Sequence, residues 1–395
     1  MKIKGFSFSA VAAGVRYKGR LDVAMIHSEI PCVTAGVFTT SMVKAAPVVL
    51  DMDRLQRFGE AQTILANSGC ANACTGEEGM EAAKTTGRFA AKRLGIDERL
   101  VLLSSTGVIG EALNVEAFEK NMDALVGGLS PAKFDDVARA IMTTDTVPKT
   151  AERTLILGGK EVTLIGVAKG SGMIMPNMAT MLAYICTDVA IDFGALQKAL
   201  RSANSRTFNR ITVDGDTSTN DMVLVLANGC AGNTPITILD SPAGTAFAEA
   251  LEDILKDLSL QIVRDGEGAT KMITVRVESA GSELEAEQLA RTVANSALVK
   301  TAFFGEDANW GRILAALGRA GVSFDPDMVD IFFNDVQLVC NGRAVGGQAD
   351  SRAAEVLKEK EILLTINMKR GVDVAEIYTC DFSFDYVKIN ADYRS

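Results

Sequence analysis

One threonine, Thr180, lies where a polar glycine turn meets a predicted buried strand, in the segment KGSGMIMPNMATMLAYICTD at 169–188. By residue type alone it is an ordinary β-branched strand residue. A second interpretation is that its hydroxyl is a nucleophile, which would need a base. The chain has a single histidine, His27, so a Ser-His-Asp triad or a catalytic zinc site would have to use it. We expect His27 to be structural instead.

A threonine can use its own α-amine as the base. An α-amino group has an unperturbed pKa of about 7.7–8.0, close to what general base catalysis at neutral pH requires. An internal Thr180 has no free amine, but self-cleavage would create one. Its hydroxyl would attack the carbonyl of Ala179, and water would open the resulting ester. This hypothesis predicts two chains, 1–179 and 180–395.

The cysteines favour reduced thiols over disulfides or a metal site. There are seven, an odd number, and no CxxC pair. Cys70 and Cys74 have a C-x3-C spacing, but no second pair or nearby histidine completes a set of ligands. We expect small buried residues in a reducing compartment, and no metal.

Composition indicates an ordinary globular protein of 395 residues, 48% hydrophobic and 23% charged. A net charge of −10, from 40 basic and 50 acidic residues, argues against a nucleic-acid partner. No apolar run approaches the roughly 18 residues needed to span a bilayer. The N-terminal stretch is interrupted by Ser7 and Ser9 and followed by Arg16 and Lys18, unlike a signal peptide. The sequence predicts a cytoplasmic protein without a membrane partner.

The elements that must position these residues alternate between helices and strands, but not in strict order. Helical spacing of apolar residues occurs at Glu78–Leu94, at Ala117–Leu129 and, most clearly, between Phe247 and Ile262. Strands are predicted at Val101–Ser104, Glu161–Ala168, Leu182–Val189, Met222–Ala227, Met272–Val277, Ile331–Val339, Ile362–Ile366 and Ile377–Phe384. The Asn334-Asp335 turn predicts an antiparallel hairpin. We therefore expect a layered α/β fold with mixed or antiparallel sheets, not a Rossmann fold.

Two glycine-rich turns, 170–172 and 107–110, invite comparison with phosphate-binding loops. Neither completes GxGxxG after a strand, and GxxxxGK[ST] does not occur. Tight turns are the simpler interpretation. An intermediate one is that their backbone N–H groups face a different anion.

Eight motifs run in the same order as in a known family and cover nearly the whole chain. They are NSGCANACTG at 67–76, SSTGVIG at 104–110, IMTTDT at 141–146, KGSGMIMPNMATML at 169–182, TVDGDTSTND at 212–221, RDGEGATK at 264–271, FFGEDANWGR at 303–312 and the C-terminal INADYRS. Together they resemble the self-cleaving ornithine acetyltransferases, the glutamate N-acetyltransferases of arginine biosynthesis.

This resemblance implies a layered α/β/β/α architecture with mixed sheets and an N-terminal threonine nucleophile. It also implies cleavage between Ala179 and Thr180, and transfer of acetyl from N2-acetylornithine to glutamate through acetyl-Thr180. The mechanism needs no metal or organic cofactor. The expected assembly is an α2β2 tetramer of two cleaved protomers.

The resemblance also assigns roles to single residues. The Thr106 hydroxyl and the Gly107 N–H correspond to the oxyanion-stabilising donors. Lys169 corresponds to the partner of a substrate carboxylate, and Glu267 to the partner of the ornithine side-chain ammonium. Asn390 and Ser395 match C-terminal substrate contacts, although chain ends are ordinarily frayed.

Two details stay open at this point. Thr143 and Thr144 form a polar pair near the site by resemblance, and the sequence does not decide which one reaches the substrate. Cys70 stands where the family more usually has asparagine, which leaves the conformation of the local turn undetermined. Trp310, the only tryptophan, is interpreted as a packing anchor.

Alternative functions also remain. A self-cleaving aminopeptidase or amidase would use the same Thr180 but pass the acyl group to water. A non-enzymatic amino-acid-binding protein would keep the pocket in an uncleaved chain. No motif decides whether acetyl-CoA also serves as an acetyl donor.

Overall fold

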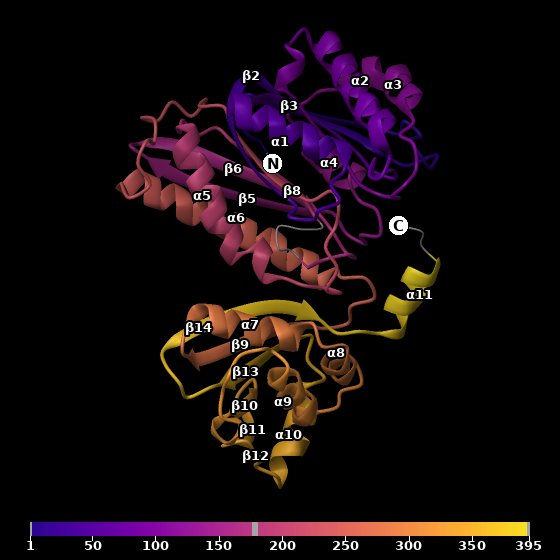
Figure 1. Ribbon diagram of the computed structural model, residues 1–395. Coiled ribbons are helices and arrows are strands. Elements are labelled where there is room, and N and C mark those ends of the chain that lie inside the picture. Colours follow the sequence, from indigo (N-terminus) through magenta and orange to yellow (C-terminus); the bar gives the residue numbers. More distant parts are fainter. Residues whose placement is uncertain (1, 176–180, 393–395) are drawn as a thin grey trace. The chain divides into compact units, whose positions relative to one another are not determined.

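The computed structural model describes residues 2–175 and 181–392, and the chain forms two compact units (Figure 1). The first unit is drawn from Met1–Asn209 and Asp216–Ile262, and the second from Arg210–Gly215 and Val263–Arg394. A cut after Ala179 would therefore fall within the sequence range of the first unit instead of separating the two.

The first unit is built on a mixed sheet, as the sequence predicts. In the described part of the chain the strand order is β4-β3-β2-β8-β7-β6-β5, with β1 paired to β2. The pairs β3·β4 and β7·β8 are parallel, and the other pairs are antiparallel. The strands are β1 (Phe6–Val11), β2 (Val23–Phe38), β3 (Glu60–Asn67), β4 (Val101–Ser105), β5 (Lys149–Leu157), β6 (Lys160–Lys169), β7 (Leu182–Thr187) and β8 (Met222–Ala227).

Strand β2 is long enough to pair with three other strands of this sheet. Residues 23–28 pair with β1, β3 pairs with positions between 23 and 33, and residues 33–38 pair with β8. The register with β3 shifts between His27 and Cys32, as a bulge allows. His27 lies on this strand, and its Nδ1 is 2.9 Å from the Thr63 hydroxyl, consistent with a structural role.

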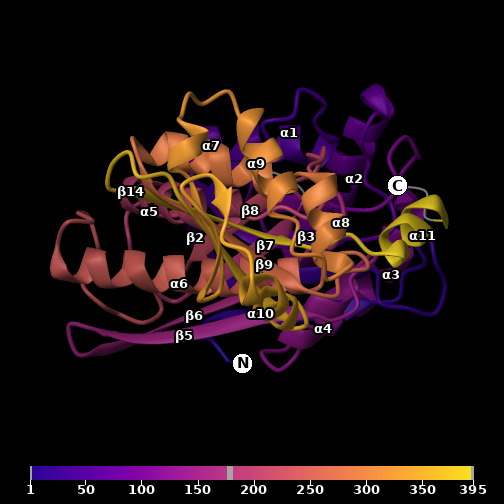
Figure 2. The same ribbon diagram turned by 90° about the horizontal axis from the view of Figure 1, so that it is seen from below.

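Helices cover this sheet with their apolar faces. The stripe predicted between Phe247 and Ile262 is buried along its length. A Cβ at Gly166 of β6 would lie 2.8 Å from Leu258 Cδ1, so glycine at this position lets α6 approach the strand (Figure 2). The helices are α1 (Ala46–Phe58), α2 (Gly76–Leu94), α3 (Val115–Gly127), α4 (Phe134–Ala140), α5 (Phe193–Arg206) and α6 (Pro242–Arg264).

The second unit has its own mixed sheet, of order β12-β11-β10-β13-β9-β14 in the described residues. Only β9·β13 is a parallel pair among them. The strands are β9 (Met272–Ala280), β10 (Asp330–Phe333), β11 (Val336–Cys340), β12 (Arg343–Ala344), β13 (Glu361–Asn367) and β14 (Asp373–Cys380). The helices are α7 (Glu283–Ala294), α8 (Ala297–Phe304), α9 (Trp310–Gly318), α10 (Gln348–Val356) and α11 (Phe384–Asp392).

Two sequence predictions for this unit have different outcomes. The hairpin is confirmed: Phe333 pairs with Val336 across the two-residue turn, and Asn334 has φ of 49°. The strand predicted at Ile377–Phe384 is wrong at its end, because β14 stops at Cys380. The Asp381 carboxylate accepts hydrogen bonds from the amides of Thr270 and Lys271, which turns the chain away from the strand.

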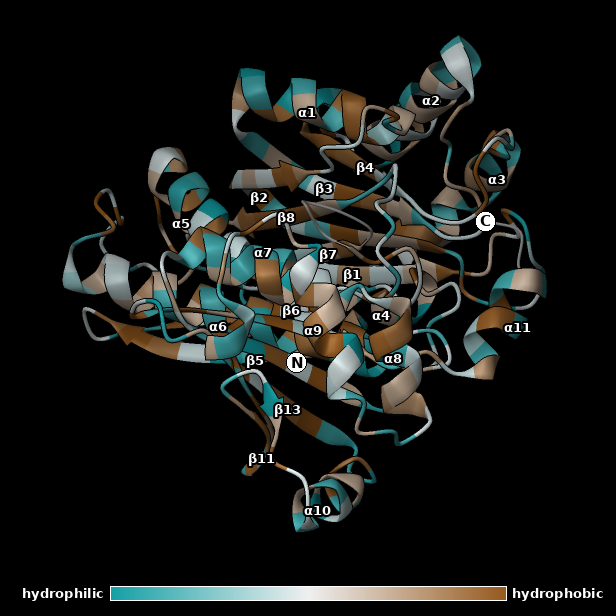
Figure 3. Cartoon of the chain, turned by 60° about the horizontal axis from the view of Figure 1, so that its bottom comes forward, coloured by the Kyte–Doolittle hydropathy of each residue, from teal (hydrophilic) through white to brown (hydrophobic). Residues whose placement is uncertain are grey.

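Each unit has a distinct apolar interior. In the first, Phe8, Leu102, Tyr184 and Leu224 belong to one buried cluster. In the second, α7 residues pack with β9 and β13 residues, and Trp310 is partly buried against that core, which confirms its packing role. Figure 3 shows brown, hydrophobic stretches on the strands and mixed brown and teal on the helices. Among the described residues, no helix combines the length and apolarity that crossing a bilayer demands.

Candidate active site

The first group of predicted site residues lies where two parallel strands end together. Strand β3 ends at Asn67 and β4 at Ser105, and these two residues pair in the parallel ladder. The chain after β4 continues into Thr106 and Gly107. The Thr106 amide donates to the Asn67 carbonyl at 3.0 Å, and the Ser105 hydroxyl donates to the Asn67 side chain at 2.7 Å. Parallel pairing therefore sets the NSGC and STG motifs side by side.

Glycine is required at position 107 because the two loops approach each other closely. Gly107 has φ of +130°, and a Cβ there would lie 2.3 Å from the backbone carbon of Gly69. Cys70, the departure from the family pattern, is buried and bridges Thr106 and Val108. The local turn is thus well defined with cysteine in place.

Buried polar side chains form hydrogen bonds with these two segments. The Asn220 amide group donates to the carbonyls of Ala71, at 2.7 Å, and Ser105, at 2.8 Å. The Tyr184 hydroxyl donates to the Ser104 hydroxyl at 2.6 Å. Asn220, which precedes β8, therefore ties the first loop to the end of β4, and Tyr184 of β7 makes a separate contact with β4.

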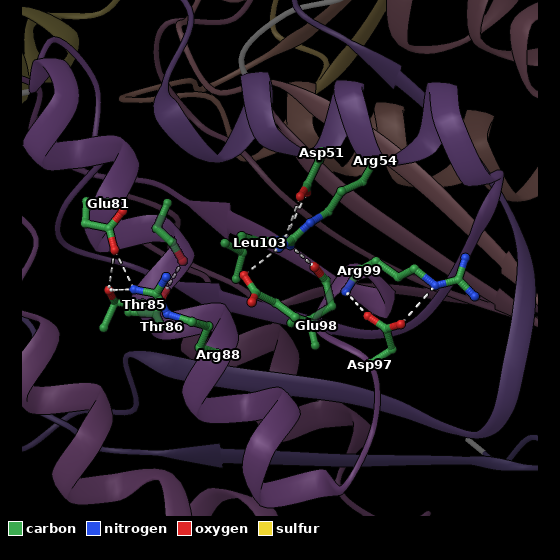
Figure 4. A network of polar contacts seen from close by, with 12 residues as sticks. Asp51, Arg54, Glu81, Thr85, Thr86, Arg88, Asp97, Glu98, Arg99 and Leu103 are labelled. Carbon is green, nitrogen blue, oxygen red and sulfur yellow. Dashed lines mark hydrogen bonds and ion pairs between the residues drawn. The ribbon is translucent and has the colours of Figure 1, made fainter.

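Strand β4 is also anchored by helix α1, as Figure 4 shows. Both carboxylate oxygens of Asp51 accept from the Leu103 amide, at 3.1 and 2.9 Å, and the Arg54 guanidinium donates to the Val101 carbonyl. Burial raises the pKa of Asp51 well above its ordinary value, against the opposing effects of Arg54 and the Leu103 amide. Two residues one helical turn apart thus fix the strand that delivers Thr106.

Two hydrogen-bond donors of this loop have no acceptor among the described residues. The Thr106 hydroxyl and the Gly107 amide donate to no group in the part of the chain that the structure describes. Both residues are only partly buried. Neighbouring donors that are available to a bound ligand are what an oxyanion hole requires.

Lys169 lies beside these donors at the end of β6. Its ammonium donates to the Thr143 hydroxyl at 2.9 Å and lies 3.5 Å from the Thr106 hydroxyl oxygen. Thr144 forms no hydrogen bond among the described residues, so the geometry brings Thr143 to Lys169. Lys169 is 3.7 Å from the Asp145 carboxylate, which also pairs with Lys149 at 2.7 Å.

Asp145 organises both backbone segments of this group. It accepts from the amides of Thr143, at 3.0 Å, and Gly170, at 2.7 Å. Burial alone would raise the pKa of Asp145, but the Lys169 and Lys149 ammonium groups hold it well below its usual range. The Gly170 N–H thus faces the carboxylate of Asp145 and not a nucleotide phosphate.

The second group of predicted residues lies in the second unit. The Asn390 side-chain amide, on α11, donates to the Glu267 carboxylate at 2.7 Å. A Cβ at Gly268 would lie 2.4 Å from the Tyr386 amide, so the Glu267 loop packs tightly on the start of α11. Glu267 is buried, and its second oxygen accepts no hydrogen bond within the described chain. A buried carboxylate with a free oxygen can receive an ammonium group.

Three predicted site residues have no described position. Ala179, Thr180 and Ser395 lie outside the described residues. Those that are described fall into two groups, one in each unit. Thr106, Gly107, Thr143 and Lys169 come together in the first unit, and Glu267 and Asn390 in the second.

Several contributors to the site were not identified from the sequence. Asp145, Lys149 and Asn220 lie inside or beside quoted motifs, but a buried role cannot be distinguished from a solvated one without the packing around them. The spacing of four residues between Asp145 and Lys149 is a weak signal on its own. No group of three or more His, Cys, Asp or Glu residues that could hold a metal occurs in the described ranges.

The close approach of Gly107 to Gly69 can be tested by adding a single methyl group at position 107, as in Gly107→Ala. We expect Gly107→Ala to lower the free energy of unfolding by roughly 2–4 kcal/mol, because strain from the left-handed backbone and the overlap with Gly69 add. Gly110→Ala is the matched control, since Gly110 has φ of +80° and nothing lies within 4 Å of the position that an added methyl group would take. Urea unfolding of both variants measures these changes in the free energy of unfolding. Equal decreases for Gly107→Ala and Gly110→Ala would contradict the close approach of the Gly107 and Gly69 loops.

Known proteins similar to this chain were found by family, sequence and structure. The model of the ArgJ family matches residues 7–395. The arginine biosynthesis bifunctional protein ArgJ of Desulfotalea psychrophila is 62% identical, and that of Geobacter sulfurreducens 51% identical, each over 100% of both chains. The crystal structure of ArgJ from Bacillus halodurans has a TM-score of 0.52 at 43% identity, covering 54% of this chain and 100% of that one.

Proposed function

Because the chain belongs to the ArgJ family, the glutamate N-acetyltransferases of arginine biosynthesis, we propose that it moves acetyl from N2-acetylornithine to glutamate through acetyl-Thr180. The observation that carries this proposal is a pair of donors without an acceptor among the described residues, the Thr106 hydroxyl and the Gly107 amide, beside a buried positive charge. Acyl transfer generates negative charge on a carbonyl oxygen, and preorganised donors stabilise it.

The nucleophile is made by the chain itself. The Thr180 hydroxyl attacks the Ala179 carbonyl carbon, the carbon–nitrogen bond breaks, and water opens the ester to give chains 1–179 and 180–395. The new α-amine of Thr180 then serves as the base for its own hydroxyl. The hydroxyl attacks the acetyl carbonyl of acetylornithine, and ornithine leaves. Glutamate next attacks the acetyl-threonine, which restores the free hydroxyl.

Charges on the two units support the choice of amino-acid substrates. In the first unit, Lys149, Asp145 and Lys169 together carry one excess positive charge in a buried setting, which favours an arriving carboxylate. In the second unit, the Glu267 oxygen that accepts no hydrogen bond from the described residues suits the side-chain ammonium of ornithine, and Asn390 fixes that carboxylate. Ser395 is proposed as a further contact at the C-terminus.

The remaining elements of the proposal concern the protein's surroundings. The chemistry needs no cofactor, and acetyl-CoA would be a second acetyl donor, not a bound group. We place the enzyme in the cytoplasm, in keeping with seven free cysteines, and as an α2β2 assembly.

Steady-state kinetics test this function. Double-reciprocal plots for acetylornithine at several glutamate concentrations should be parallel, because the acetyl group waits on the enzyme between the two substrates. Lines that intersect would contradict an acetyl-enzyme. Acetate release that is independent of glutamate would instead favour the amidase alternative, and the same assay with acetyl-CoA decides whether it is a donor.

A further inference from the structure

The buried charges behind the Thr106 loop form a connected cluster. The Asp145 and Lys149 side chains are fully buried and 2.7 Å apart, and the Lys169 side chain is 7% exposed. Each Asp145 oxygen accepts one backbone amide, from Gly170 or Thr143, in addition to facing a lysine. A carboxylate so fully engaged has little freedom to move.

The direction of the hydrogen bonds around Lys169 is fixed by chemistry. An ammonium has three donors and no acceptor, so the Thr106 and Thr143 oxygens can only accept from it. Among the described residues, three side-chain oxygens lie near the ammonium: Thr143 at 2.9 Å, Thr106 at 3.5 Å and Asp145 at 3.7 Å. The Thr106 hydroxyl hydrogen must then point away from Lys169.

We propose that Asp145 is a positioning residue for acetyl transfer: it holds the Lys169 ammonium against Thr106 and so directs the Thr106 hydroxyl hydrogen toward the reacting oxygen. This inference rests on the proposed function and on the oxyanion role of Thr106. Lys149 balances the carboxylate, which leaves the charge of Lys169 available to strengthen Thr106 as a donor.

A purely structural ion pair would leave a different signature. If Asp145 only stabilised the fold, its removal would change the activity by the same factor whether or not Thr106 carried a hydroxyl. If it acts through that hydroxyl, its removal should matter only while the hydroxyl is present. Double-mutant cycles measure this difference.

The experiment uses four processed proteins: the wild type, a paired variant with Asp145→Asn and Lys149→Met, Thr106→Ala, and the combination. Both members of the pair are changed because Asp145→Asn alone would leave two buried ammonium groups facing each other. Only material that mass spectrometry shows to be fully cleaved is assayed, and thermal unfolding confirms that each variant is folded.

The paired variant should lower kcat about tenfold or more with KM for acetylornithine unchanged, but by less than about threefold in the Thr106→Ala background. Asp188→Asn is the control, since Asp188 is also buried and accepts the Thr163 amide at the far end of β7. Its effect should be the same in both backgrounds.

Equal losses for the paired variant in both backgrounds, or no loss in either, would overturn the proposal while leaving the acetyltransferase function intact. Absence of acetyl transfer by the processed wild-type protein would instead refute the proposed function. The two failures are therefore distinguishable in one set of assays.

Discussion

Replacing Thr180 by alanine is expected to leave one uncleaved chain of 41.9 kDa whose acetyl transfer is reduced roughly 10⁴-fold or more. The reason is that the same hydroxyl opens the peptide bond after Ala179 and later carries the acetyl group. Scaling 41.9 kDa by 179/395 and 216/395 of the residues, the wild type should instead give fragments of about 19 and 23 kDa.

Thr180→Ser is the matched control for this prediction. Serine keeps a hydroxyl on the same atom of the side chain, so cleavage and transfer should both persist at measurable rates. Intact-mass spectrometry of the purified proteins reads the outcome directly. Cleavage that continues in Thr180→Ala would refute self-processing by this residue, and a wild type that remains one chain would favour the amino-acid-binding alternative.

The second large effect is expected at Thr106. Thr106→Ala should lower kcat by roughly 10²–10³, the usual loss for one oxyanion donor, with little change in KM. The hydroxyl has no acceptor among the described residues, so we expect it to donate to the oxygen that becomes negative in the transition state and to matter less for the bound substrate.

Processing could imitate this result, because the same donor serves the Ala179 carbonyl during self-cleavage. The kinetics must therefore be measured on fully cleaved protein, with Thr106→Ser as a control that keeps the hydroxyl. If Thr106→Ala raised KM alone and left kcat intact, the oxyanion role would be wrong and Thr106 would simply end β4.

Much of the fold is predictable because local patterns agree with the packing. The apolar stripe that became α6 and the Asn334-Asp335 turn each determine their element with little help from the rest of the chain. Strand β2 was not predicted, because its two halves pair with different partners and neither half shows a regular alternation. The predicted strand that became β14 extended too far for a similar reason. Asp381 ends the observed strand through contacts with a loop 110 residues earlier in the chain.

For the site, too, the motifs identified some residues, whereas the roles of others depend on packing between distant segments. Motif order pointed to Thr106, Gly107, Lys169, Glu267 and Asn390, and the structure brings together those of each unit. The role of Asp145 was beyond the sequence, because it depends on two lysines and two amides that reach it from different segments. That Thr143 contacts the Lys169 ammonium likewise follows only from the packing of the two segments.

The most direct test of the central claim is to trap the acetyl-enzyme. Processed protein mixed with acetylornithine in the absence of glutamate, quenched in acid and digested, should yield one acetylated peptide, the one that begins with Thr180. Adding glutamate before the quench should remove that label. A label on another residue, or on none while transfer to glutamate proceeds, would contradict a mechanism through acetyl-Thr180.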